Sequence, residues 1–284
     1  FGVNAGDAIV SGGNYNTVVG DEAGTAISTG DQNTAVGYQA LATENANSNN
    51  TAIGYQALKD QDGGDGNTAV GSFALQDLTN ASRATAVGSY AGFSSQGADD
   101  VTFIGHNAGL YATTAGASVF VGSNAGRGIT GTKLTGNNNT AVGKNAGLLL
   151  QGAVQGNTLV GMDCGQGITT GNVNTAMGVD ALRTCSTGIE NVCVGIGAGF
   201  KITDGNDNTM LGAYAGYYNG TTTGAGITTG SNNCYIGNLS YPTAVDVDNE
   251  FTLGNANTDN LRCADTSISA LSDERDKTNI VDVP

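Results

Sequence analysis

The stretch Asn33-Thr-Ala-Val-Gly37 decides the fold of this chain, because it returns as Asn50-Thr-Ala-Ile-Gly54 and again as Asn67-Thr-Ala-Val-Gly71. The glycines that end such stretches, which we call the marker glycines, are Gly20, Gly37, Gly54, Gly71, Gly88, Gly105, Gly122, Gly143, Gly161, Gly178, Gly195, Gly212, Gly237 and Gly254. They are 17 residues apart six times in succession, and then 21, 18, 17, 17, 17, 25 and 17 residues apart. A fixed short period predicts a solenoid of stacked coils.

The composition narrows the class of protein further. The chain of 284 residues has 46 glycines and 2 prolines without a third-residue period, which excludes collagen, and its regularly placed apolar residues (39%) argue against disorder. The net charge of −15 makes nucleic acid and anionic membrane surfaces unfavourable partners. No apolar run is long enough to span a bilayer. The start at Phe1, without a methionine or leader, indicates a piece of a longer protein.

The five cysteines are odd in number and lack the pairwise spacing of a metal site. Cys164, Cys193 and Cys234 fall at regular repeat positions, where we expect small buried thiols rather than disulfides. This fits assembly in a reducing cytosol. We expect no cofactor.

Positions within each repeat can be numbered from the marker glycine, so that column −1 precedes it and column +1 follows it. Column −1 is aliphatic throughout, and column −3 is threonine in ten repeats. These two columns share one face of a short strand, because side chains alternate along a strand. Column −2 faces the other way, yet it is apolar too, as at Ala35, Phe103 and Leu159. Both strand faces are therefore expected to be buried, one inside the coil and one against other copies of the chain, most simply in a homotrimer.

Three further columns complete the prediction. Column +3 is alanine or cysteine, which indicates a tight contact, and column +4 is leucine or glycine, as at a bend with positive φ. Column −4 carries asparagine at Asn16, Asn33, Asn50, Asn67, Asn139, Asn157, Asn174 and Asn208, and these amides should form a ladder.

The sequence predicts an all-β parallel β-roll or β-helix solenoid over residues 1–254. About fifteen rungs spaced by ~4.8 Å would give a rod on the order of 70 Å long.

The repeated stretch resembles the Asn-Ser/Thr-x-Ala-Ile-Gly repeat of trimeric autotransporter adhesin heads. That resemblance, over most of residues 1–254, implies a parallel β-roll with three chains side by side. The period is longer here, and threonine replaces the usual serine of those heads, so the resemblance concerns the architecture and not a binding specificity.

The stretch Ser272-Asp-Glu-Arg-Asp-Lys277-Thr-Asn-Ile280 resembles the entry into the intramolecular chaperone domain of phage endosialidases and other tail fibres and spikes. Ser272, Asp273, Arg275, Lys277 and Ile280 match its signature. The resemblance implies a transition segment at 255–271 and the start of a chaperone domain at 272–284, which would continue beyond Pro284.

In that family the chaperone domain helps three chains to fold and is then released by self-cleavage. Carried over, Ser272 would be the nucleophile, Lys277 its essential partner and Leu271–Ser272 the bond that is cut. A serine needs a nearby base, and a lysine of lowered pKa can serve. The alternative is that Ser272 caps a helix whose first turn carries Asp273 and Glu274.

Two longer intervals between marker glycines predict surface loops, at 128–136 and at 217–230. Tyr214, Tyr217, Tyr218 and Lys133 are the candidate receptor-binding residues, because tyrosine offers a sugar both apolar contact and hydrogen bonds. Spacer loops without a ligand are the alternative. His106 is expected to be exposed, and the aspartates around Asp62 and Asp204 lack the pattern of a calcium loop.

The function expected from these features is the adhesive shaft of a phage tail fibre, located in the virion and assembled in the host cytoplasm. Its partners would be two further copies of itself, other virion tail proteins, and a glycan or protein receptor of the host. A glycan-degrading tailspike is the enzymatic alternative, and it would need paired carboxylates in a groove. A bacterial trimeric surface adhesin is a third possibility, and an ice-binding solenoid is a more remote fourth.

Overall fold

The computed structural model describes residues 2–217, 227–244 and 246–259. The chaperone-like residues Ser272, Asp273, Arg275, Lys277 and Ile280, the loop residue Tyr218 and most of the 255–271 segment lie outside these ranges. Within the described ranges the secondary structure consists of fourteen strands and no helix: β1 (Thr17–Val19), β2 (Thr34–Val36), β3 (Thr51–Ile53), β4 (Thr68–Val70), β5 (Thr85–Val87), β6 (Thr102–Ile104), β7 (Val119–Val121), β8 (Thr140–Val142), β9 (Thr158–Val160), β10 (Thr175–Met177), β11 (Val192–Val194), β12 (Thr209–Leu211), β13 (Cys234–Ile236) and β14 (Phe251–Leu253).

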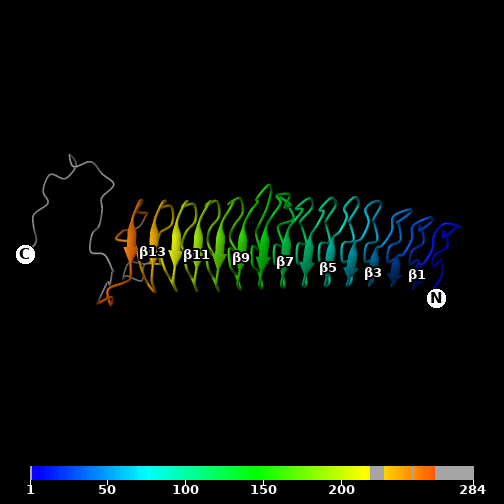
Figure 1. The fold of residues 1–284 in the computed structure, drawn as a ribbon, viewed down its shortest axis with the longest axis horizontal. Coiled ribbons are helices and arrows are strands. Elements are labelled where there is room, and N and C mark those ends of the chain that lie inside the picture. Colours follow the sequence, from blue (N-terminus) through cyan, green and yellow to red (C-terminus); the bar gives the residue numbers. More distant parts are fainter. Residues whose placement is uncertain (1, 218–226, 245, 260–284) are drawn as a thin grey trace, which may run out of the picture.

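The strands form one parallel sheet in which the spatial order equals the chain order, from β1 to β14 (Figure 1). The register follows the sequence period, so that Thr17 pairs with Thr34 and Val36 pairs with Ile53. Each strand therefore lies one coil away from the next, and the chain climbs by one strand spacing per coil. At ~4.8 Å per coil the strands span roughly 60 Å. The predicted all-β parallel solenoid is confirmed.

The middle residue of each strand points into the coil. Ala35, Phe103 and Leu159, all in column −2, have no exposed surface. The residues of columns −3 and −1 point outward and are half-buried or exposed, as at Ile53 and Leu211. The inner face thus consists of column −2, and the threonine and aliphatic columns form the outer face of the sheet.

The marker glycines are required by the backbone. From Gly20 to Gly212 their φ angles lie between 125° and 140°, which is a region that disfavours any side chain. A Cβ atom at each of these positions would also lie within 2.7 Å of the carbonyl oxygen of the next marker glycine. The repeat therefore ends in glycine because the coils approach each other most closely there.

In the core, the size of the side chain in column −2 is related to the size of the side chain in column +4. Where column −2 is alanine, as at Ala52, column +4 can be a fully buried leucine, as at Leu58, even though its φ is +49°. Where column −2 is large, as at Phe120, column +4 is glycine, and a Cβ on Gly126 would lie 2.5 Å from the phenyl ring. In these coils a large residue in one column goes with a small one in the other, whereas Ala86 with Gly92 and Ala141 with Gly147 are small in both.

The asparagine ladder of column −4 is present and takes two forms. Between Asn139 and Asn233 each side-chain Nδ2 donates to the Oδ1 of the preceding asparagine, as from Asn191 to Asn174 at 3.1 Å. In the N-terminal coils the Oδ1 accepts from the backbone N–H of the next column −4 residue, as from Asn50 to Asn33 at 2.9 Å, and the C-terminal asparagines make this backbone bond as well. The amide-to-amide ladder is thus confirmed only for the C-terminal half.

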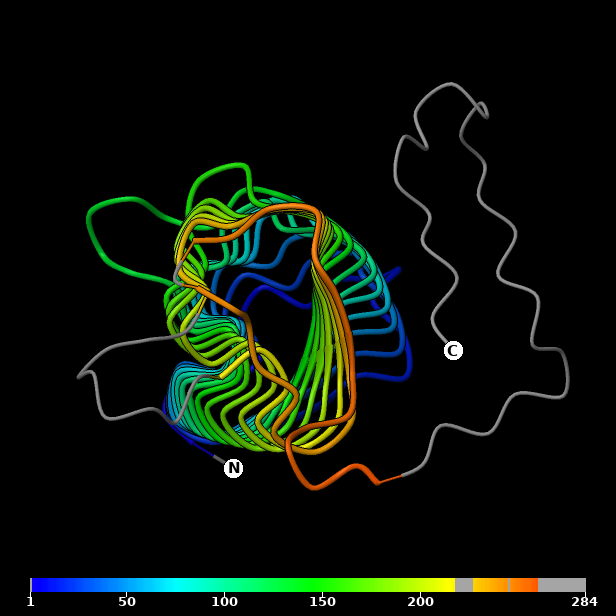
Figure 2. The same ribbon diagram turned by 90° about the vertical axis from the view of Figure 1, so that its left-hand side faces the viewer.

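The insertion at 128–136 is partly absorbed into the solenoid. Leu134 is fully buried and forms parallel bridges with Ala112 and Gly152, so it supplies a wall residue to its own coil. Residues 130–133 before it are exposed. Seen along the axis of the rod, the segments near residues 130 and 150 extend beyond the common outline of the coils (Figure 2). Of the second insertion, residues 218–226 lie outside the described ranges.

Candidate ligand-binding corner

One corner of the coil gathers the aromatic side chains. It consists of columns +1, +2 and +5, just after each marker glycine, and we call it the corner row. Ring-to-ring contacts between successive coils show that these side chains lie beside one another along the rod. The corner row is the first candidate for a site, because aromatic rings with neighbouring polar groups are typical of ligand-binding surfaces.

In the N-terminal part of the corner row, the rings cover one another. The Tyr38 and Tyr55 ring centroids are 5.3 Å apart at an interplanar angle of 27°, and those of Phe73 and Tyr90 are 4.8 Å apart at 21°. Such stacking contributes about 0.5–1.5 kcal/mol per pair to stability. Because each ring uses its face against the ring of a neighbouring coil, this part of the row serves the fold.

In other parts of the corner row, side-chain amides form hydrogen bonds with neighbouring amides and carboxylates. Gln39 Nε2 donates to Glu22 at 2.6 Å, and Gln56 Nε2 donates to Gln39 at 2.6 Å. A second run links Asn107, Asn124, Asn145 and Asp163 through side-chain hydrogen bonds. These groups have little hydrogen-bonding capacity left for a ligand.

The corner row opens into a depression between β10 and β13. Its lining residues are Asp180, Arg183, Phe200, Tyr214 and Tyr217, and its volume is about 280 Å³. Gly197 occupies column +2 between Asp180 and Tyr214. A Cβ on Gly197 would lie 2.7 Å from the ring of Tyr214. The absence of a side chain at Gly197 therefore lets the Tyr214 ring lie against the backbone of that coil, at the edge of the depression.

The groups in this depression meet at angles rather than in a stack. The Phe200 and Tyr217 rings are 6.2 Å apart at 87°, and the Tyr214 and Tyr217 rings are 5.9 Å apart at 53°. The guanidinium of Arg183 lies 5.8 Å from the centroid of Phe200, and its Nη1 lies 3.1 Å from Asp180 Oδ1. The site thus combines aromatic surface with a paired cation and carboxylate.

A second depression of about 250 Å³ lies along the same row, lined by Tyr90, Phe93, His106, Asn107, Leu110 and Tyr111. His106 is exposed, as expected from the sequence. The Leu134 backbone N–H donates to the Tyr111 carbonyl at 3.0 Å, so the 128–136 insertion borders this depression.

Of the four candidate receptor-binding residues, the structure brings together only Tyr214 and Tyr217. Lys133 is exposed in the coil between β7 and β8, five coils from Tyr214, and Tyr218 lies outside the described residues. The repeat pattern did not single out Asp180, Arg183 and Phe200. They were detectable, because columns +2 and +5 hold Asp180, Gly197, Tyr214 and Arg183, Phe200, Tyr217 in three consecutive repeats.

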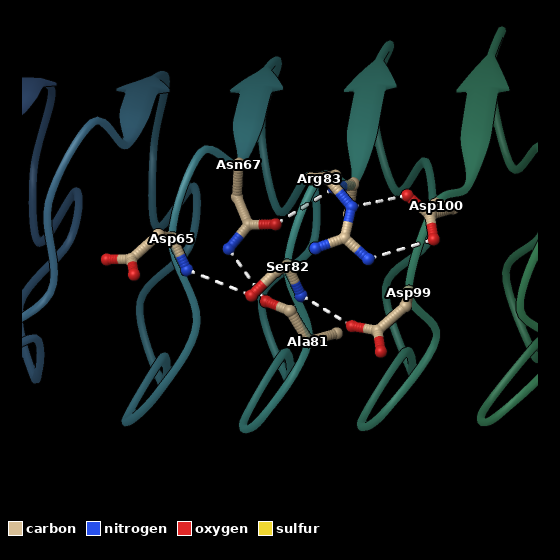
Figure 3. Close-up of polar contacts among 8 residues, drawn as sticks. Asp65, Asn67, Ala81, Ser82, Arg83, Asp99 and Asp100 are labelled. Carbon is tan, nitrogen blue, oxygen red and sulfur yellow. Dashed lines mark hydrogen bonds and ion pairs between the residues drawn. The ribbon is translucent and has the colours of Figure 1, made fainter.

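Asp65 and Asp99 belong to another ladder, in column −6 (Figure 3). The Asp65 backbone N–H donates to Ser82 Oγ at 3.1 Å, and the Ser82 N–H donates to Asp99 Oδ1 at 2.7 Å. Nearby, Arg83 forms a bidentate pair with Asp100. In another turn, hydrogen bonds from Thr187 and Ser186 lower the pKa of Asp204. Nowhere in the described ranges do three or more potential metal ligands come together.

Four cysteines lie in the described part of the chain, and all four are free thiols. Burial raises the pKa of Cys164 and that of Cys185 from 9.0 to about 12, and it raises the pKa of Cys193 further. Buried thiols of raised pKa are poor nucleophiles, so these three act as small apolar side chains of the core. Cys263 lies outside the described residues.

Comparison of the chain with protein-family models, with curated proteins and with solved structures gave no match. In the portion of the chain that the structure describes, no helix has the length and apolarity needed to cross a membrane.

Proposed function

We propose that this chain is the shaft of a homotrimeric fibre that serves in host attachment, as in a phage tail. The observation that carries the proposal is the exposure of apolar side chains on the outer face of the sheet. Column −1 is aliphatic in every repeat, yet on the single chain Ile53, Val87 and Leu211 remain 39–50% exposed. An apolar row that continues along the whole rod is a surface that another molecule covers.

The partner that fits this row best is the chain itself. A second copy offers an apolar row of the same length and the same repeat, so the contact can be made at every coil. The fourteen strands carry none of the chain's 25 acidic residues, so their association buries no like charges despite the net charge of −15. Three rods around one axis form a closed assembly in which every outer face is covered.

The role in host attachment is supported by the fibrous shape and by the resemblance of the 272–280 segment to a fibre chaperone. The depressions described above do not favour a glycan-degrading tailspike. The one beside Tyr214 contains a single carboxylate, Asp180, which is paired with Arg183, and the one beside Tyr111 contains none. Glycoside hydrolysis needs two carboxylates in one groove.

The proposal is tested by sedimentation equilibrium of the full chain. The expected mass is three times the 28.3 kDa of one chain, at all loading concentrations above the micromolar range. A stable species of 28.3 kDa would refute the fibre proposal. The chaperone part is tested separately by mass spectrometry of the full-length gene product, which should show cleavage before Ser272 that Ser272→Ala or Lys277→Ala abolishes.

A further inference from the structure

We propose that the depression formed by Asp180, Arg183, Phe200, Tyr214 and Tyr217 binds a neutral sugar, as the contact point of the fibre with a host-surface glycan. This inference rests on the proposed role in host attachment and names the ligand class and the site. Of the depressions along the corner row, this one joins aromatic surface to a charged hydrogen-bonding pair.

The aromatic part of the site is accessible. Tyr214 is 43% exposed, and its ring meets that of Tyr217 at 53° while the Phe200 and Tyr217 rings meet at 87°. A pyranose has an apolar face of C–H groups that packs on such rings, while its hydroxyl groups point outward. Gly197 fixes the place of one ring, because any side chain there would displace the ring of Tyr214.

The polar part of the site matches hydroxyl groups, each of which donates one hydrogen bond and accepts others. Arg183 Nε donates to Gln166 at 3.3 Å and Nη1 lies 3.1 Å from Asp180, which fixes the plane of the guanidinium. Asp180 Oδ1 is buried against Nη1, but the two side chains remain 29% (Asp180) and 39% (Arg183) exposed. The exposed parts of the pair therefore place a guanidinium donor beside a carboxylate, the arrangement that two adjacent hydroxyls of one sugar can engage.

The charge and size of the site indicate a neutral and small ligand unit. Asp180 compensates the charge of Arg183, and the net charge of −15 on each chain disfavours anionic glycans. The volume of about 280 Å³ is close to the lower end of the range for ligand sites. We therefore assign the site to a terminal mono- or disaccharide unit of a neutral glycan.

The test is saturation-transfer NMR of the full chain with methyl glycosides of glucose, galactose and mannose and with lactose and maltose, beside an anionic arm of sialyllactose and glucuronic acid. We expect at least one neutral probe to bind. Tyr214→Ala and Arg183→Ala should each weaken that binding at least about tenfold. Arg183→Lys should weaken it as well, because lysine keeps the charge but loses the planar fork.

The matched control is Tyr38→Ala, since Tyr38 has nearly the same exposure as Tyr214 and lies in the same corner row, stacked on Tyr55. It should leave sugar binding unchanged.

Binding of the anionic probes alone, or neutral binding that survives both Tyr214→Ala and Arg183→Ala, would overturn the assignment, as would no binding by any probe. Sedimentation of the same samples separates the two proposals. A trimer without sugar binding defeats only this inference, and a sugar-binding monomer defeats only the trimeric fibre.

Discussion

The marker glycines carry two constraints at once, a positive φ and the contact with the next coil. At Gly88 the φ is 135°, and a Cβ would lie 2.6 Å from the Gly105 carbonyl oxygen. Gly88→Ala should therefore lower the free energy of unfolding by at least about 2–3 kcal/mol, through backbone strain and displaced coils. Urea denaturation followed by circular dichroism measures the effect.

Gly97→Ala is the matched control for Gly88→Ala. Gly97 lies outside the positive-φ region, and its Cβ would meet nothing closer than the Thr114 methyl group at 3.9 Å. This variant should be neutral or more stable by about 0.4–1 kcal/mol, because alanine restricts the unfolded chain. Equal losses in the two variants would mean that the coil contact at the marker glycine is not what requires glycine.

The buried thiols give the stability a predictable dependence on pH. In the folded chain the pKa of Cys164 and that of Cys185 are raised to about 12, while in the unfolded chain they return to about 9. Between these values the unfolded state releases protons and the folded state does not. The contribution of these thiols is thus complete below pH 9 and is lost as the pH rises toward 12, by at most about 1.4 kcal/mol per pH unit for each thiol.

Urea midpoints measured between pH 7.5 and pH 10.5 should therefore fall more steeply in the native chain than in a Cys164→Ala/Cys193→Ala variant. Alanine is the usual residue in column +3 and common in column −2, so both replacements fit the repeat. An identical fall in both proteins would assign the pH effect to other groups.

Single residues also show what the sequence could and could not predict. The strand, the bend at column +4 and the need for glycine followed from the repeat, since each reflects local backbone geometry. Which strand face lies inside did not follow, because Ala35 and Val36 are both apolar. Residue size does not decide it either, because column −2 holds Phe103 and Leu159 in the interior as well as alanine. The proposed sugar site was found only in part from the sequence, because Asp180, Arg183 and Phe200 come from coils whose contact with Tyr214 and Tyr217 appears only in the folded chain.

A coil is built from a strand and a bend whose side chains meet in the interior and limit each other's size. Phe120 with Gly126 and Ala52 with Leu58 are two solutions to the same packing problem. Natural repeats therefore contain their own compensating substitutions. The asparagine ladder is a second device at this level, because it satisfies backbone N–H groups between strands of only three residues.

This relation between column −2 and column +4 predicts a coupled pair of substitutions. Phe120→Ala should cost about 3–5 kcal/mol by leaving a cavity. Gly126→Leu alone should also destabilise, because its side chain would meet the Phe120 ring. The double variant recreates the Ala52 and Leu58 arrangement and should recover more than half of the summed losses. Urea unfolding of the four proteins gives the coupling energy, and simple addition of the two losses would contradict this relation.

The whole rod follows the period, and the stacking of one strand per coil could be predicted from the spacing of the marker glycines, whereas the described residues form fourteen strands and not the expected fifteen or so rungs. Each coil contacts only its neighbours, so no long-range pattern was needed. The number of associated chains is a different matter. The proposed assembly covers the exposed aliphatic row at Val87 and Ile104, but the same row is compatible with different symmetries, and the repeat does not distinguish them.

The proposed assembly predicts how the rod responds to a charge placed on its outer face. Val87 and Ile104 lie in column −1 of neighbouring strands, each about 40% exposed on the single chain. In a Val87→Asp/Ile104→Asp variant, two unpaired carboxylates would be buried between chains at a cost of several kcal/mol each. The variant should sediment as a single chain. Its circular dichroism and the protection of its buried thiols should persist, because the inner core formed by column −2 is untouched.

Asn80→Asp, which adds a charge at an exposed turn, should remain assembled. If both variants kept the same trimeric mass, the outer face of the sheet would not be the surface that joins the chains.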